Sequence, residues 1–333
     1  MYTRQDVAKL AHVSVATVSN VLSGKKYVSA PLQKRVHDAI EALEYHPNQA
    51  ARCLATKQSR HLAIIVNDIC NPRYAEVTEA MQKEAASHGY IVSIVDITRF
   101  GIGNGQVFDL IARNVDGIFV ATYIDEMRAD IERAMQSGIC VVSGTSDLGA
   151  VLKIDYQAAI DEMIADLAGL GHRSIGFISC YSIHETQHDK YKCYCRALQS
   201  CGLPINPSLV VDGCPPYHAD LETGYAATRE LLARGIELTA VFAVNDLAAI
   251  GACRAIREAG LRIPQDISVV GCDDIAFSQY TEPKLSTIHV PKAEMGRRAV
   301  RMLNCQLNGG SCEKVCMPSG YVRRQTVASA NAG

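Results

Sequence analysis

The chain of 333 residues has no tryptophan, only 6% aromatic residues and no apolar run long enough for a membrane-spanning helix. Such a helix takes about 20 consecutive apolar residues, so we expect no membrane partner. The first residues, 1–6 (MYTRQD), also lack the apolar stretch of a secretory signal peptide. We therefore expect the protein to stay in the cytoplasm, with the composition of an ordinary globular protein.

Paired cysteine motifs are missing as well. The thirteen cysteines are odd in number and scattered along the chain. Neither Cys193 with Cys195 nor Cys312 with Cys316 has the CxxC spacing of a structural zinc site. In a chain without a secretory signal, such cysteines are typically reduced thiols that fill the core. We expect no metal site and no cofactor.

The net charge of −2 conceals an uneven distribution. Residues 1–60 carry nine Lys and Arg against four Asp and Glu, whereas the remaining residues carry 24 and 31. A basic N-terminal block on an acidic body indicates a polyanionic partner for that block alone.

The N-terminal residues predict three short helices. Thr3 and Asp6 have a spacing that resembles a capping box at a helix start. Ser14 is a good N-cap for a second helix, which Gly24 ends. A third helix begins near Pro31, because proline is tolerated in the first turn. The expected apolar faces are Val7, Leu10 and Ala11, then Val18, Val21 and Leu22, then Leu32, Val36, Ala39 and Leu43.

Two short helices joined by a tight turn, with a third packed against them, form a helix-turn-helix arrangement. The second helix would enter the major groove of DNA, where small polar side chains and methyl groups read base edges. A helical bundle with a purely structural role is the alternative. The outward face of the second helix favours DNA binding because it is uncharged, whereas an idle solvated face is usually rich in Lys and Glu. That face carries Val15, Ala16, Thr17, Ser19 and Asn20.

Three segments of this region closely resemble the LacI/GalR family of bacterial transcription regulators. They are residues 5–11 (QDVAKLA), 13–22 (VSVATVSNVL) and 45–52 (YHPNQAAR). The resemblance extends over almost the whole chain, through residues 169–175 (GLGHRSI), 239–246 (TAVFAVND) and 266–274 (DISVVGCDD). One departure is His12, which stands where the family usually has glycine and which we expect to strain a left-handed backbone position.

The resemblance implies a set of DNA contacts. Base readers are expected at Val15, Ala16 and Asn20, the last where arginine is common in the family. Phosphate contacts are implied at Thr3, Ser14, Thr17, Ser19, Ser23, Tyr27 and Ser29, and we add Arg4, Asn48 and Arg52 to the DNA-binding set. In the family a hinge helix folds when two subunits meet on DNA, and a leucine inserts into the minor groove. Leu54 is at that position, where an apolar wedge bends the duplex.

Beyond the hinge, strands alternate with helices. Strands are predicted at 62–66, 90–96, 117–121, 140–144, 174–179, 240–244 and 267–271, and helices near 73–88, 125–137, 157–170, 219–234 and 246–259. This alternation is typical of parallel sheets in βαβ units, which bind ligands at the carboxyl ends of their strands. The fold class is therefore a helix-turn-helix head plus an α/β core.

The resemblance implies a core of two doubly wound lobes, as in periplasmic binding proteins, joined by three crossovers. We assign residues 1–46 to the DNA-binding domain, 47–60 to the hinge and 61–333 to the effector-binding and dimerisation core. Lobe one is expected at about 61–157 and 291–322, and lobe two at about 158–290 and 323–333.

The resemblance places effector contacts at strand ends, in a cleft between the lobes. Those contacts are Arg73, Tyr74, Lys190, Asn245, Asp246 and Asp273, and Tyr217 is added as an aromatic that would stack on a sugar. Arg73 would suit an anionic ligand such as a sugar phosphate or a uronate. The alternative for some of these residues, Asp246 especially, is that they only cap helices.

Rival functions have weaker support. A solute-binding protein would lack the basic head, and the peptidase motif HExxH at 184–188 has no convincing third zinc ligand. We expect no enzyme, but a homodimeric repressor of carbohydrate-utilisation genes that binds operator DNA under control of a sugar-like effector. A regulator controlled by a phosphoprotein corepressor is the alternative, and the direction of the response stays open.

Overall fold

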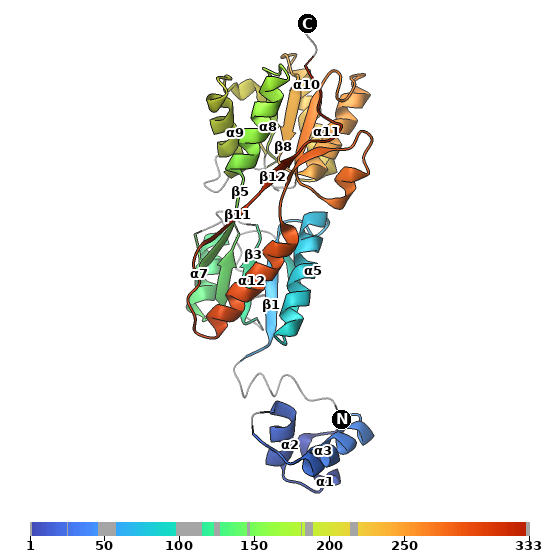
Figure 1. The fold of residues 1–333 in the computed structure, drawn as a ribbon, viewed down its shortest axis with the longest axis vertical. Coiled ribbons are helices and arrows are strands. Elements are labelled where there is room, and N and C mark those ends of the chain that lie inside the picture. Colours follow the sequence, from blue (N-terminus) through green and yellow to red (C-terminus); the bar gives the residue numbers. More distant parts are fainter. Residues whose placement is uncertain are drawn as a thin grey trace. The chain divides into compact units, whose positions relative to one another are not determined.

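The computed structural model describes residues 2–24, 26–45, 58–97, 115–122, 127–144, 147–180, 182–183, 189–213 and 219–330. The chain divides into two compact units, Met1–Ser59 and Arg60–Gly333, which are described separately (Figure 1). Within the described ranges, no helix combines the length and the apolar character that crossing a membrane demands.

The first unit contains the three predicted helices, α1 (Arg4–Leu10), α2 (Val15–Ser23) and α3 (Ala30–Ala42). The predicted caps are confirmed: Thr3 and Asp6 form a capping box, and the Ser14 side chain accepts from the backbone N–H of Thr17. Gly24 ends α2 in a left-handed conformation. A small apolar cluster holds the helices together: Val7, Ala8, Ala11, Val18, Val36, Ala39 and Tyr45.

The turn between α1 and α2 is held in a strained form. His12 has a φ of 50°, which confirms the expected left-handed residue. Arg35 of α3 braces this turn, because its Nη2 donates to the carbonyl oxygens of Ala11 and, at 2.9 Å, of His12. The expected burial of Leu10 is wrong: its side chain is exposed, and Ala8 lies in the cluster instead.

The second unit consists of two lobes, each with one sheet whose strands are parallel except for β12 in the second sheet (Figure 1). The strand order of the first sheet is β11-β5-β4-β3-β1-β2 and that of the second is β12-β10-β9-β8-β6-β7. The strands of the first sheet are β1 (His61–Val66), β2 (Ile91–Asp96), β3 (Gly117–Val120), β4 (Cys140–Ser143), β5 (Ala150–Asp155) and β11 (Val315–Pro318). Those of the second are β6 (Ile175–Ile178), β7 (Val210–Val211), β8 (Ala240–Ala243), β9 (Ser268–Asp273), β10 (Ser286–His289) and β12 (Gly320–Val322).

Helices cover both sheets, since the central strands are apolar and need burial on two faces. The α-helices of the first lobe are α5 (Pro72–Ser87), α7 (Arg128–Gln136) and α12 (Lys292–Leu307). Those of the second lobe are α8 (Gln157–Gly169), α9 (Asp189–Ser200), α10 (Leu221–Ala233) and α11 (Asp246–Glu258). Two short 3-10 helices, η2 (Pro207–Leu209) and η3 (Ala276–Gln279), also belong to the described part of this lobe.

The predicted strands and helices are found with shifts of a few residues at their ends. Several elements lie outside the predicted ranges. They include β5, whose alternating pattern AVLKID is only half buried, the two-residue strand β7, helix α12 and the last three strands. β12 pairs with β10 in the antiparallel direction, whereas β11 pairs with β5 in the parallel direction. It pairs in the second sheet at 320–322, whereas lobe one was expected to extend to 322.

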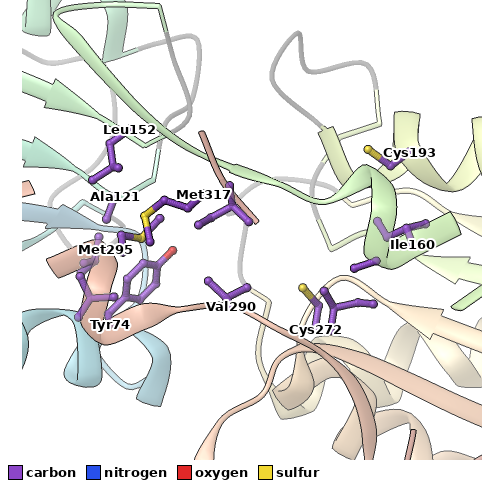
Figure 2. Packing of buried hydrophobic residues seen from close by; sticks show 14 of the residues in the cluster. Tyr74, Ala121, Leu152, Ile160, Cys193, Cys272, Val290, Met295 and Met317 are labelled. Carbon is purple, nitrogen blue, oxygen red and sulfur yellow. The ribbon is translucent and has the colours of Figure 1, made fainter. Parts of the chain in front are cut away.

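The described chain crosses between the lobes three times, after β5, after β10 and after β11. Buried apolar side chains continue across this junction in one cluster. In Figure 2, Val290 and Met317 lie between Tyr74 and Met295 of the first lobe and Cys272 and Ile160 of the second. This packing positions the strand ends of the two lobes opposite one another.

Candidate functional site

The α2 helix presents the predicted base-reading face. Val15 and Ala16 are exposed, and 42% of the Val15 surface is accessible although the side chain is apolar. Asn20 is partly exposed on the same helix, while Val18 points into the cluster. If α2 enters the major groove as predicted, these exposed side chains offer methyl groups that can contact thymine.

The predicted phosphate contacts lie around the start of α2 and the loop before α3. Ser14 Oγ and Thr17 Oγ1 are 2.9 Å apart and hydrogen-bond to each other. Thr3 is held in its capping box, and Tyr27 is 93% exposed, which leaves its phenol ring free for a partner. Arg4, Ser19 and Ser29 are partly exposed.

Several predicted residues lie outside the described part of the chain. These are Asn48, Arg52, Leu54 and Tyr217, together with the histidines of the HExxH motif and the side chain of Ser23.

The structure brings four predicted effector residues together where the lobes meet. Arg73 lies in the first turn of α5, and its Nη1 donates to Asp273 Oδ1 at the end of β9, 2.9 Å away. Lys190 of α9 has its Nζ 3.9 Å from the same oxygen and donates to the Val244 carbonyl at 2.7 Å. Tyr74, beside Arg73, donates to Asn67 Oδ1 at 2.7 Å. The Arg73–Asp273 pair therefore links the two lobes directly.

Two further residues belong to this cluster and were missed by the sequence analysis. Tyr156 comes directly after β5, and its ring centroid lies 5.0 Å from Lys190 Nζ. Lys292 begins α12 and donates at 2.7 Å to the backbone carbonyls of both Asp273 and Asp274. Tyr156 and Lys292 each lie where the chain crosses from one lobe to the other. A polar or aromatic residue at such a crossover is the one feature of the sequence that could have identified them as site residues.

The segment that Lys292 holds is itself strained. Asp273 has a φ of 113° and Asp274 a φ of 53°, in the region that favours glycine. Asp274 is fixed by Arg324 at 2.5 Å and by His289 at 2.9 Å. Such a strained turn persists only where its surroundings hold it.

Asn245 and Asp246 have mainly structural contacts. Asn245 caps α11 by accepting from the Ala248 N–H, and it donates to the Ala219 carbonyl. The carboxylate of Asp246 accepts from the Ile275 N–H and the hydroxyls of Ser278 and Thr287. All these partners lie in the second lobe. The contacts favour the alternative that Asn245 and Asp246 stabilise the fold of that lobe and do not contact the effector.

The electrostatics of the cluster follow from burial and close charges. Burial, with the charge of Asp273 nearby, raises the pKa of Asp246 to about 6. Burial alone would lower the pKa of Arg73, but the Asp273 carboxylate raises it well above its usual value. Burial also opposes the charge on Lys190, yet its neighbours Cys272, Tyr156 and Asp273 raise the pKa of the amine overall. Arg73 and Lys190 are therefore charged at neutral pH.

This arrangement is suited to binding a polar ligand. It offers charged donors, a carboxylate and two aromatic rings, drawn from both lobes. Among the described residues, no group of three or more His, Cys, Asp or Glu side chains is placed to hold a metal ion.

Comparison with known proteins matches two separate parts of the chain to family models. Residues 3–48 match the family model for bacterial regulatory proteins of the lacI family, and residues 164–327 match that for a periplasmic binding protein-like domain. The chain is 33% identical over 310 residues to the ribose operon repressor of Haemophilus influenzae, covering 91% of each protein.

Two solved structures extend the likeness to the fold. The lac repressor dimer bound to operator and the anti-inducer ONPF is 26% identical, with a TM-score of 0.84 over 98% of this chain and 99% of that one. The complex of the transcriptional regulator CelR with cellobiose is 27% identical, with a TM-score of 0.71 over 98% and 100%. These relatives are transcription regulators and not enzymes. The chain belongs to the lacI family of bacterial regulatory proteins, which are DNA-binding transcription repressors.

Proposed function

We propose that this protein is a homodimeric repressor of carbohydrate-utilisation genes whose operator binding is controlled by a sugar-like effector bound between the lobes. The Arg73–Asp273 ion pair carries the proposal, because it joins α5 of one lobe to β9 of the other. A ligand that contacts either residue changes the free energy with which the lobes are held together. Cellobiose bound to the relative CelR supports a sugar as the ligand.

The DNA-binding residues of the proposal are those of the α2 face and its surroundings. Exposure of Val15 and Ala16 supports their role as base readers. Asn48, Arg52 and Leu54 enter through the family resemblance alone. The operator-bound dimer of the lac repressor supports a homodimer on a pseudo-palindromic operator, in the cytoplasm where such DNA is found.

The effector set is Arg73, Tyr74, Lys190, Asp273 and Tyr217, extended by Tyr156. We keep Asn245 and Asp246 as supports of the site, since their polar atoms already have partners. The proposed division is a DNA-binding domain at 1–46, a hinge at 47–60 and a core at 61–333.

A selection experiment tests the proposal. Full-length protein selects bound sequences from random duplex DNA, with and without a panel of sugars and sugar acids. We expect enrichment of a palindrome whose recovery one ligand changes. A matched Val15→Glu variant, with a carboxylate facing the bases, should enrich nothing. Failure of the wild-type protein to enrich any sequence under any ligand would contradict the proposal and favour a phosphoprotein-dependent regulator.

A further inference from the structure

Two buried cations of the interlobe cluster, Arg73 and Lys190, share one carboxylate. The Arg73 and Lys190 side chains are 11% and 12% exposed, and that of Asp273 is 2% exposed. Both cations approach the same Oδ1 atom, at 2.9 and 3.9 Å. Buried charges are stable only when they are paired, so a single shared carboxylate leaves positive charge to be balanced.

The other carboxylates near Arg73 and Lys190 contact other residues. Asp246 accepts three hydrogen bonds from the second lobe. Asp274 is held by Arg324 and His289. Glu76, whose side chain is 41% exposed, lies 3.5 Å from Lys292 Nζ. In the part of the chain that the structure describes, Asp273 is therefore the carboxylate that Arg73 and Lys190 contact.

The guanidinium of Arg73 also has an N–H group without a hydrogen-bond acceptor. Asp273 takes a hydrogen bond from Nη1, whereas Nε is buried and has no hydrogen-bond partner. A guanidinium has five N–H donors in a planar fork that matches the oxygens of a carboxylate or a phosphate. An unpaired buried N–H is unfavourable, so an anion that reached this fork would bind strongly.

We propose that the effector is a hydroxylated small molecule with one anionic group, a carboxylate or a phosphate, that binds Arg73 and Lys190 in competition with Asp273. The proposal rests on the interlobe site being the effector site. The aromatic rings of Tyr74 and Tyr156, which lie beside these two cations, would contact the rest of the ligand. Because Arg73 and Asp273 belong to different lobes, the anion weakens a direct interlobe contact when it binds.

Inorganic phosphate is the first probe, because it carries the anion alone. Thermal unfolding of the full-length protein is followed as phosphate replaces chloride at constant ionic strength. A saturable shift of about 2–4 °C is expected for a millimolar site. Arg73→Met and Lys190→Met should lose this shift, whereas the control Arg262→Met, at an exposed Arg262–Asp266 pair, should keep it.

The variant Asp273→Asn separates the proposal from a loss of folding. It removes the competing carboxylate, so phosphate should bind about three times more tightly or better. Misfolding cannot strengthen binding. The proposal is overturned if phosphate gives no saturable shift, or if Arg73→Met and Lys190→Met respond like the wild-type protein.

A matched ligand series then tests separately whether the effector is anionic and whether the protein responds to a sugar-like effector at all. Glucose, glucuronate and glucose 6-phosphate share one ring, and each is added to the protein on its selected operator. A change in operator affinity with either anionic member but not with glucose supports the proposal and distinguishes carboxylate from phosphate. A change with glucose alone overturns the anionic effector but leaves the proposed function intact.

Discussion

Among single residues, Asp246 has the most unusual surroundings. Its side chain is fully buried at the start of α11, and three donors from the second lobe hold its two oxygens. The pKa of about 6 lies above the ordinary value of 3.8. Between these pH values the folded protein binds a proton that the unfolded chain has already released.

This difference predicts the pH dependence of stability. The contribution of the protonated Asp246 is complete below pH 4 and is lost as the pH rises through 6. The free energy of unfolding of the wild-type protein should therefore fall, relative to Asp246→Asn, by up to about 3 kcal/mol over that range. Urea unfolding from pH 4 to 8 measures it, and two parallel curves would show that the carboxyl does not titrate there.

Single residues also show where sequence reasoning stops. The caps at Thr3 and Ser14 and the left-handed His12 were predictable because they depend on neighbours a few positions away. Tyr156 and Lys292 join the interlobe cluster only through the way two lobes meet. The spacing of nearby residues does not indicate how the two lobes pack together, so Tyr156 and Lys292 were not predicted.

At the scale of elements, α10 and α11 approach each other unusually closely. A Cβ added at Gly251 would overlap the Leu221 carbonyl oxygen, and one at Gly224 would overlap the backbone of Ala248. Both glycines are therefore needed for the contact between these helices.

The close approach predicts opposite effects for two glycine substitutions. Gly251→Ala should destabilise the core by about 2–3 kcal/mol, because the helices must separate. Gly169→Ala, at the end of α8 with no atom within 4 Å of the added Cβ, should stabilise it by up to about 1 kcal/mol. Urea unfolding of both variants measures the difference, and equal effects would contradict the packing.

The hinge is the element whose role is proposed from resemblance alone. If Leu54 wedges into the minor groove at the operator centre, its contribution requires a bent duplex. Leu54→Ala should then weaken binding to the selected operator by about tenfold or more, with little effect on random DNA. Binding titrations with both duplexes decide the matter, since an equal loss on both would refute the wedge.

Prediction of elements succeeded where the period of the pattern was plain. β8 is a continuous apolar run, and β1 is one after its first residue, as is typical of strands buried in parallel sheets. The β5 strand alternates apolar residues with Lys153 and Asp155, and β12 has only three residues. β5 pairs with β4 and β11, and β12 pairs with β10 at the edge of the second sheet. Pairing with neighbouring strands defines both, and their own residue pattern does not predict them.

For the whole molecule, effector control of DNA binding requires that changes between the lobes affect the DNA-binding head. The Arg73–Asp273 pair and the grip of Lys292 on Asp273 tie the two lobes at one point. A ligand at that point biases the relative arrangement of the lobes, and any such bias must change the free energy of operator binding if the two are linked.

Operator affinity of the wild-type protein and of Asp273→Ala, with and without the ligand found by selection, tests this coupling most directly. The wild-type protein should change its affinity by about tenfold or more on adding ligand. Asp273→Ala should no longer respond to ligand, because the Arg73–Asp273 contact on which the ligand acts is already absent. The control Asp266→Ala, at a surface ion pair of the same lobe, should respond normally. A normal response of Asp273→Ala would contradict the account.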